Sequence, residues 1–439
     1  MDDATANKIR LRMIITAGTG FFTDAYDLFV IGVVTSILSG LWHLTITQIA
    51  LLNGASLAAA SLGALFFGTA SDKFGRKAIY GFEVLVLFIG AILSAISPNF
   101  IWLVISRIVV GFGIGGDYPT SAVFASENST HKNRGFLVLL VFAMQALGLM
   151  VGPLLAAGLL SLHISHHWTW RILLGIGAIP AASVFYLRRT ISETPHYLLS
   201  KQTPVEVSRV VSELTDYKEP ITYTYKKQKL LSRKWLKCLI GTAGAWFLLD
   251  VAFYGNGISS VMIMKHLVPN ASLLKEVLLS AFIFLCFAVP GYVLAAKTVD
   301  RIGRKILQIA GFLIMAACYT VIALIPSIVE ILPLFIAIFG LSFFFVNFGP
   351  NTTTFLIPSE IYPTSIRAKS HGISAAIGKV GAFVGAFALP IALKQYGLPF
   401  TIGAMAVVSL LGVAITFLLP EMKNRSLEST EVMQYQLFD

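Results

Sequence analysis

The sequence predicts an all-α membrane protein with twelve transmembrane helices in two pseudo-symmetric bundles of six. The first observation is the composition: the 439-residue chain is 56% hydrophobic and only 13% charged, whereas charged residues make up about 25% of a soluble domain. The second is a series of apolar windows that reach the roughly 20 residues needed to cross a bilayer as a helix. The third is a repeat that relates the two halves of the chain.

The apolar windows define the expected helices and the domain boundaries. A polar linker at 188–235 separates an N-terminal bundle (1–187) from a C-terminal bundle (236–419), and a tail follows at 420–439. The twelve predicted spans are 13–39, 47–70, 78–97, 100–124, 136–161, 169–187, 236–263, 273–296, 305–326, 330–356, 370–394 and 398–419.

The distribution of positive charge predicts the orientation of the chain. The net charge is +11, which in a soluble protein would suggest a nucleic-acid partner. Here the lysines and arginines gather at the termini, in the linker and after spans 2, 4, 8 and 10, as the positive-inside rule describes. We therefore expect a multi-pass protein of a cell membrane (plasma or inner), with cytoplasmic termini and no nucleic-acid partner. We also expect a monomer.

The two halves repeat their charged loops, which is a mark of a transporter built from duplicated bundles. The sequence DKFGRK at 72–77, after span 2, returns as DRIGRK at 300–305, after span 8. A glutamate and a later arginine follow span 4, and a pair with the same spacing follows span 10. The charged residues of these loops that we expect to act in gating or structure are Asp72, Arg76, Glu127, Arg134, Asp300, Arg304, Glu360 and Arg367.

These loops resemble those of the major facilitator superfamily. The signature between helices 2 and 3 of that superfamily is matched by Gly68, Asp72, Gly75, Arg76 and Lys77, and the second copy has Ala296 in place of the first glycine. The resemblance implies two bundles that rock about a central cavity. It also implies that the loops latch the inward-closed state through Asp–Arg pairs and helix-end dipoles. The alternative is that the charges only fix the topology.

Few ionisable residues remain at membrane depth once the loops are set aside. Such residues are costly in hydrocarbon, so each is a candidate functional residue. They are Asp24, Asp27, Arg107, Asp117, Asp250 and Lys379. Asp117 follows a glycine-rich stretch, GFGIGG, that lets another helix or a substrate approach the backbone. We expect Arg107 to pair with an acid of helix 1 or 2, or to cap a neighbouring helix.

Helix 7 carries a polar stripe, because Trp246, Asp250 and Tyr254 recur every four residues. The stripe offers an indole N–H, a carboxyl and a phenol, each able to hydrogen-bond an oxyanion or a hydroxyl group. A packing stripe with an incidental acid is the simpler alternative, which the cost of an acid at this depth disfavours.

The repeat places polar residues at related positions in the two halves. Asp24 corresponds approximately to Asp250. The other two related pairs are Asp117 with Asn351 and Gln145 with Lys379. Polar residues at symmetry-related positions predict one site at the interface of the halves.

Five stretches narrow the resemblance to the phosphate:proton symporters of the superfamily. They read FFTDAYDLF at 21–29, GGDYP at 115–119, WFLLDVAFY at 246–254, NFGPNTTTF at 347–355 and GKVG at 378–381. The resemblance implies a phosphate site formed by Tyr118, Gln145, Trp246, Asp250, Tyr254, Asn351 and Lys379. It implies proton coupling through Asp24, Asp27 and Asp117.

The chemistry of these residues suits phosphate. Near neutral pH phosphate still carries a proton, because its second pKa lies at about 6 to 7. Asp250 can accept a hydrogen bond from the P–OH group while Lys379 supplies positive charge; sulfate has no hydroxyl to offer. Burial favours the neutral form of a carboxyl group, so we expect the three coupling acids to exchange protons during transport.

Other functional classes find less support. The GK at 378–379 lies in a hydrophobic span and is no phosphate-cradling loop, so a gradient rather than ATP should drive transport. The eight histidines, including His371, are expected at loops or helix ends without ligand spacing. We expect no enzyme activity, metal or cofactor. The alternatives are a proton-coupled symporter of another small anion (an organic acid) or of a sugar, and a membrane sensor.

Overall fold

The structure, a computed structural model, describes residues 3–74, 79, 81–127, 129, 133–188, 230, 232–325, 327–425 and 427. Within these ranges the side chains are described from residue 14 onward, except those of Asp72 and Glu127. Arg76 and most of the predicted linker and tail therefore lie outside the described residues, as do the side chains of Asp72 and Glu127.

The described residues of the N-terminal half fold mainly into apolar helices. They are α1 (Asp3–Leu41), α2 (Ile46–Phe74), α4 (Phe82–Ala95), α5 (Phe100–Glu127), α6 (Arg134–Ser161), α7 (His166–Ile176) and α8 (Ala178–Arg188). Predicted span 6 is divided at Gly177 into α7 and α8. A Cβ at Gly177 would lie 2.8 Å from Asp27 Oδ1, so glycine lets the end of α7 approach α1.

The C-terminal half repeats this organisation with more interruptions. Its helices are α11 (Arg233–Ile258), α12 (Ser260–Leu267), α13 (Leu273–Ile283), η1 (Phe284–Ala288), α14 (Val289–Ile302), α15 (Arg304–Leu324), α16 (Ser327–Glu330), α17 (Leu332–Phe348), α18 (Pro350–Ile361) and α19 (Arg367–Thr416). The π-helical turn η1 lies next to Pro290, and α17 gives way to α18 at Gly349, just before Pro350. Proline lacks the backbone N–H of a continuous helix, which explains both positions.

The predicted membrane-spanning character is confirmed. Ten helices in the described ranges are long and apolar enough to cross a membrane, and Phe82–Ala95 is a shorter apolar helix. The 50-residue α19 contains the eleventh predicted span and most of the twelfth, and it is interrupted at Gly397, whose φ of 78° is non-helical. The number of crossings itself stays a prediction, since these helices are identified by length and composition.

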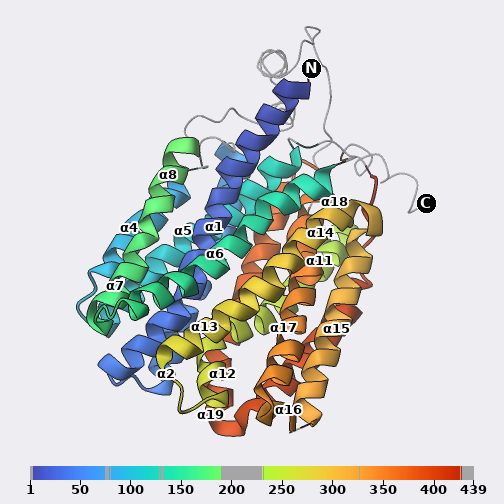
Figure 1. Ribbon diagram of the computed structural model, residues 1–439. Coiled ribbons are helices and arrows are strands. Elements are labelled where there is room, and N and C mark those ends of the chain that lie inside the picture. The colour runs from blue at the N-terminus through green and yellow to red at the C-terminus, as the bar shows by residue number, and fades with distance from the viewer. Residues whose placement is uncertain are drawn as a thin grey trace, which may run out of the picture.

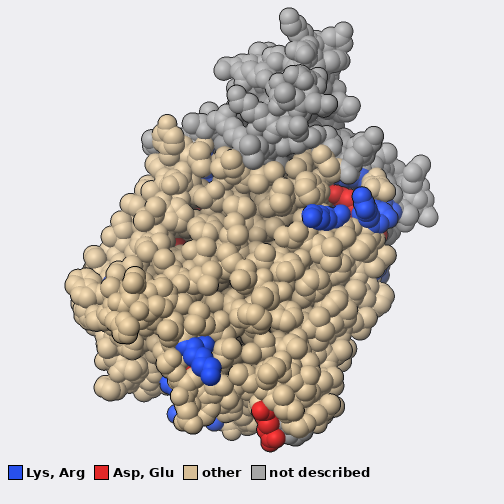
Figure 2. Space-filling model, viewed as in Figure 1, with Lys and Arg blue, Asp and Glu red and all other residues tan. Residues whose placement is uncertain are grey.

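The two halves lie side by side, and their charged groups gather at the ends. In Figure 1, α1 begins at the upper end of the view, where α18 also lies, whereas α7, α12 and α16 lie at the lower end. Figure 2 shows a broad middle band nearly free of charged side chains. Large apolar side chains such as Leu62, Ile101 and Leu324 are exposed. A surface of this kind suits contact with lipid.

Glycine lets the halves pack closely where α2 meets α19. A Cβ at Gly68 would lie 3.1 Å from the Cα of Gly372, so the two backbones touch at this point. Small residues are the usual means of close helix approach in membranes. The glycine of the signature after span 2 therefore serves contact between the halves.

Candidate substrate and proton site

Three charged or polar side chains meet at the centre of the C-terminal half. Lys379 Nζ, from α19, donates hydrogen bonds to Tyr254 Oη at 2.8 Å and to Asp250 Oδ2 at 3.2 Å. Asp250 and Tyr254 come from consecutive turns of α11. Lys379, Asp250 and Tyr254 are each only 1% exposed. A buried ion pair of this kind requires partners for its remaining polar atoms. The N-terminal half of the molecule supplies some of these partners.

Tyr118 of α5 brings the N-terminal half into the same network. Its hydroxyl lies 3.1 Å from the hydroxyl of Tyr254. The ammonium group of Lys379 lies 4.2 Å from the ring centroid of Tyr118 and 4.3 Å from that of Tyr254. Lys379 is thus held between two aromatic faces, a cation–π arrangement that joins one ring from each half.

A chain of amide and phenol groups continues the network across the interface of the halves. Gln145 of α6 donates to Tyr118 Oη at 3.4 Å and accepts a hydrogen bond of 2.6 Å from Tyr292 of α14. Asn351 of α18 donates to Tyr292 Oη at 2.6 Å and to Asn347 Oδ1 at 2.7 Å. These groups are buried, and each can exchange its present partner for a ligand oxygen.

Trp246 forms an aromatic wall beside these polar groups. Its ring centroid lies 6.0 Å from that of Tyr118 and 5.4 Å from that of His371. A Cβ at Gly378 would lie 2.6 Å from Trp246 Cδ1, so the glycine before Lys379 leaves room for the indole. The structure thus brings together all seven residues that the sequence assigns to phosphate, and their role in binding stays a prediction.

Two residues of this region were not foreseen. Tyr292 bridges Gln145 and Asn351, but in the sequence it is a single polar residue in an apolar span. His371 was expected near a helix end, and it lies in the second turn of α19. Its burial was not foreseen: the side chain is fully buried, and Nε2 lies 3.1 Å from the carbonyl of Phe355.

A second buried cluster lies within the N-terminal half. Arg188, at the end of α8, contacts Asp117 of α5 at 2.7 Å and Glu83 of α4 at 2.8 Å. Ser121 also donates a hydrogen bond to Asp117. Asp24 of α1 lines a small cavity together with Asp117 and Glu83. Two of the three predicted coupling acids, Asp24 and Asp117, therefore share one environment.

Glu83 and Arg188 were missing from the predicted site. Glu83 is an acid inside a predicted span, so its depth was a usable signal. Arg188 stands at the boundary of the polar linker, where its charge is explained equally well by topology. Both side chains are fully buried in the structure.

The third predicted coupling acid, Asp27, lies apart from this cluster and faces Arg107. An Arg107 Nη donates to the backbone carbonyl of Asp27 at 2.7 Å, and the other Nη lies 3.7 Å from Asp27 Oδ1. Arg107 thus pairs with an acid of the first helix, one of the two arrangements that the sequence predicts. Both side chains are fully buried.

The charged loops meet across the two halves at the end predicted to face the cytoplasm. Glu360 of α18 contacts Arg134 of α6 at 2.8 Å and Arg304 of α15 at 2.8 Å. Asp300 contacts Arg304 at 2.9 Å and accepts a hydrogen bond of 2.8 Å from the backbone N–H of Phe136, in the first turn of α6. We call Arg134, Asp300, Arg304 and Glu360 the inner latch.

The inner latch combines an acid–arginine network with a carboxylate at a helix N-terminus, which is the arrangement that the resemblance to the superfamily implies. Arg367, the remaining described residue of the repeated loops, donates through Nε to the carbonyl of Tyr362 at 3.1 Å. This hydrogen bond stabilises the turn before α19. Arg134, the counterpart of Arg367, joins the two halves.

A helical membrane fold in two related halves, with a buried polar network shared between them, defines a transporter of the major facilitator superfamily. The chain belongs to the Sugar (and other) transporter family, whose model matches residues 13–433. The family relationship predicted from the loops is thereby confirmed.

Relatives and solved structures place the chain within this class. It is 34% identical to the probable inorganic phosphate transporter 1-3 of Arabidopsis thaliana, over 98% of this chain and 96% of that protein. It is 36% identical to the probable inorganic phosphate transporter 1-7 of the same species, over 98% of this chain and 93% of that protein. The proton:xylose symporter XylE bound to 6-bromo-6-deoxy-D-glucose shares the fold, with a TM-score of 0.82 at 18% identity over 97% of this chain and 99% of that one.

Proposed function

We propose that this protein is a secondary active transporter that imports inorganic phosphate by symport with protons, through alternating access. The observation that carries the proposal is the buried network in which Lys379, Asp250 and Tyr254 of one half meet Tyr118 of the other. The relatives that are named inorganic phosphate transporters, matched over nearly their whole length, support the same substrate.

The network offers the groups that a protonated phosphate needs. Lys379 attracts the anion, and the phenols of Tyr118 and Tyr254 donate hydrogen bonds to its oxygens. Asp250 accepts a hydrogen bond from the remaining P–OH group. An anion without a hydroxyl would leave the carboxylate facing a negative oxygen, so the Asp250–Lys379 pair favours phosphate over sulfate.

The N-terminal cluster suits the proton. Arg188 faces the carboxylates of both Glu83 and Asp117, and Asp24 lines the same small cavity. If every group is ionised, the negative charge exceeds the positive, which is costly inside the bilayer. A proton taken from outside reduces this excess, so that the halves can close around the anion. Its release to the cytoplasm restores the repulsion that helps to expel phosphate.

Alternating access requires that one end closes while the other opens. The inner latch ties the two halves together at one end, and a cavity lies between α1, α2, α12 and α13 at the other. This arrangement supports a state that is closed toward the cytoplasm. We place the protein as a monomer in a cell (plasma or inner) membrane, with both termini cytoplasmic and with the bundle boundaries given above.

A transport assay tests the proposal. The purified chain in liposomes with an imposed pH gradient, acidic outside, should accumulate labelled phosphate, and collapse of the gradient should abolish accumulation. Unlabelled arsenate should compete, whereas sulfate, glycerol phosphate and hexoses should not. Accumulation of a labelled hexose without phosphate uptake would refute the assignment.

One observation favours a second candidate, a sugar symporter. Gln145, Asn347 and Asn351 form a connected amide group, and amides are common partners of sugar hydroxyls. The ammonium group of Lys379 beside Asp250 distinguishes the two, because a neutral sugar gains little from a buried cation. The hexose arm of the same assay decides between them.

A further inference from the structure

A cavity opens between the halves at the end opposite the inner latch. It has a volume of about 400 Å³ and is lined by the C-terminal part of α1, the N-terminal part of α2, the start of α7 and the segment from α11 to α13. These segments border the loops with few positive charges, which the positive-inside rule places outside the cell. Its volume lies within the range of small-molecule sites, about 300–1,000 Å³.

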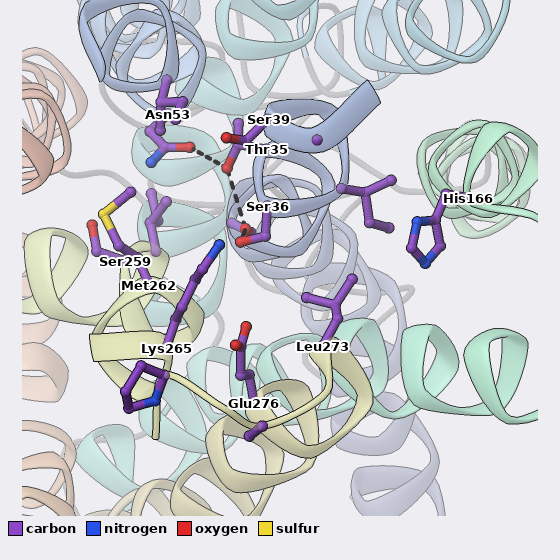
Figure 3. A pocket seen from close by; sticks show the side chains of 17 residues that line it. Thr35, Ser36, Ser39, Asn53, His166, Ser259, Met262, Lys265, Leu273 and Glu276 are labelled. Atoms are coloured by element: carbon purple, nitrogen blue, oxygen red, sulfur yellow. Dashed lines mark hydrogen bonds between the residues drawn. The ribbon is translucent and has the colours of Figure 1, made fainter. Parts of the chain in front are cut away.

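One cation and one carboxylate point into this cavity. Figure 3 shows the side chain of Lys265, from α12, and that of Glu276, from α13, directed into the open space. Lys265 is exposed, whereas Glu276 is only 4% exposed. Lys265 makes no ion pair within 4.0 Å among the described residues, and its ammonium group interacts with the carboxylate of Glu276 only at longer range, across the cavity. An anion can therefore approach Lys265 from the open space.

Hydroxyl and amide groups line the wall around these charges. Ser259, at the break between α11 and α12, is 2% exposed, and its Oγ has no hydrogen-bond partner among the described residues. Thr35 donates to Asn53 Oδ1 at 3.1 Å, and Ser36 stands one residue further along α1. A buried hydroxyl without a partner is costly, and an oxyanion in the cavity would supply the missing acceptor.

Aromatic rings separate this cavity from the buried network. Phe29 of α1 packs against Tyr254 and Phe253 of α11, with centroids 5.4 Å from each. Phe29 precedes the lining residue Gly32 by three positions, and Tyr254 precedes the lining residue Ile258 by four. The floor of the cavity is therefore about one helical turn from a direct partner of Lys379.

We propose that the cavity is an outer docking site, in which phosphate from outside binds to Lys265 before it passes Phe29 to the buried network. The inference rests on the proposed function. Lys265, Glu276 and the surrounding hydroxyls repeat the chemistry of Lys379, Asp250 and the two phenols: one ammonium group, one carboxylate and neutral donors. A protonated phosphate satisfies all three, with Glu276 accepting from its P–OH group.

The outer site should be weaker than the buried one. Lys265 is exposed, and exposed charges act through high-dielectric solvent and are screened by salt within a Debye length of about 10 Å at 0.1 M. Its main effect is to raise the local anion concentration and the rate of capture. Loss of Lys265 should therefore change KM much more than the maximal rate.

Replacing Lys265 tests the site directly. K265Q should raise the KM for phosphate about fivefold, the factor that corresponds to one unit charge at close range in water, with a maximal rate near that of wild type. K265R should restore KM. The matched control is K275Q, because Lys275 is an exposed lysine of α13 that does not line the cavity. Added salt should raise the KM of wild type and K275Q but not that of K265Q.

Chemical modification separates charge from structure. In a C286S background, which removes the exposed cysteine, K265C should regain a low KM after reaction with aminoethyl methanethiosulfonate. Reaction with the negatively charged sulfonatoethyl reagent should raise KM further. E276Q should allow external sulfate, which does not compete in wild type, to compete with phosphate, because the substitution removes the carboxylate that repels a fully deprotonated oxyanion.

The outcomes distinguish the two proposals. Equal KM and equal salt dependence in K265Q and wild type, with phosphate imported by both, would overturn the docking site and leave the proposed function intact. A failure of wild type to import phosphate in the same liposomes would overturn the proposed function itself. Equal effects of the two methanethiosulfonate reagents on K265C would also overturn the docking site.

Discussion

The two buried ion clusters contain the same chemical groups in different proportions. In the network shared by the halves, one ammonium group, that of Lys379, faces one carboxylate, that of Asp250. In the N-terminal half, one guanidinium group, that of Arg188, faces the two carboxylates of Glu83 and Asp117. The first pair is neutral when ionised, whereas the second group of three carries one excess negative charge, to which Asp24 beside it adds another when ionised.

This difference suggests how one molecule can bind phosphate and a proton at separate clusters. The Asp250–Lys379 pair has no net charge, so a bound anion makes it negative and requires a compensating positive charge. The Arg188 cluster is negative already, so binding a proton lowers its electrostatic energy even without substrate. Asp117 and Tyr118 are neighbours in α5, and the side chain of Tyr118 belongs to the other cluster. We propose that a change of charge at Asp117 reaches the substrate network through this helix.

The largest effect is expected when the balanced pair is broken. D250A leaves the ammonium group of Lys379 buried without its carboxylate, a change that costs about 3–5 kcal/mol. Phosphate uptake should fall by at least about 100-fold, which corresponds to roughly 3 kcal/mol. The measurement is labelled phosphate uptake in liposomes with a pH gradient. Wild-type uptake by D250A would remove Asp250 from the site.

A charge-neutral double variant separates binding from folding. D250N with K379M removes both charges, so the melting temperature should recover relative to D250A while uptake stays absent. If the double variant transported phosphate normally, the balanced pair would have no part in recognition.

The second-largest effect is expected for removal of Arg188, which increases the excess negative charge of the N-terminal cluster. R188Q leaves Glu83 and Asp117 buried without their cation, so the melting temperature should fall and uptake should drop about tenfold or more. R301Q, at an exposed arginine, is the matched control and should change neither. Combining R188Q with E83Q and D117N should restore the melting temperature without restoring the response to external pH.

For D117N we expect a smaller loss of uptake rate, together with loss of the dependence of uptake on external pH. The amide cannot exchange a proton, so uptake should no longer increase as the external pH falls. Exchange of labelled for unlabelled phosphate across the membrane needs no net proton movement and should stay within about threefold of wild type, or less than 1 kcal/mol. Undiminished accumulation of phosphate against its gradient in D117N would refute the coupling role.

The sequence identified both members of the Asp250–Lys379 pair, but of the Arg188 cluster it identified only Asp117 and its neighbour Asp24. Asp250 and Lys379 lie deep inside apolar windows, where a charge is costly whatever surrounds it. The four-residue spacing of Trp246, Asp250 and Tyr254 then fixes a shared helix face. The helical membrane fold follows from the same windows and is confirmed, because a bilayer constrains length and hydropathy independently of tertiary contacts.

The missing parts depend on contacts between distant segments. Arg188 stands where the hydropathy pattern ends, and only its contact with Asp117 across 71 residues of chain shows that it is buried. The close approach of Gly177 to Asp27 likewise joins segments that are far apart in the sequence. Tyr292 acquires significance only through Gln145, which belongs to the other half. No local pattern encodes these contacts.

The smallest effect is expected for E83Q, which tests the comparison most directly. This substitution removes one of the two carboxylates that Arg188 faces, so Arg188 and Asp117 then form a one-to-one pair like that of Lys379 and Asp250. The glutamine can still accept a hydrogen bond from Arg188, so folding should be preserved. Uptake under an acidic external solution should stay within about twofold of wild type, a difference below 1 kcal/mol.

The dependence of uptake by E83Q on external pH should become shallower, because a cluster with one carboxylate fewer gains less from a proton. Uptake measured over a series of external pH values at constant membrane potential gives this slope. E83D, which keeps the charge, is the matched control and should retain the wild-type slope. A wild-type slope in E83Q would mean that the imbalance at Arg188 has no part in coupling, and that the proton is carried by Asp24 or Asp27 alone.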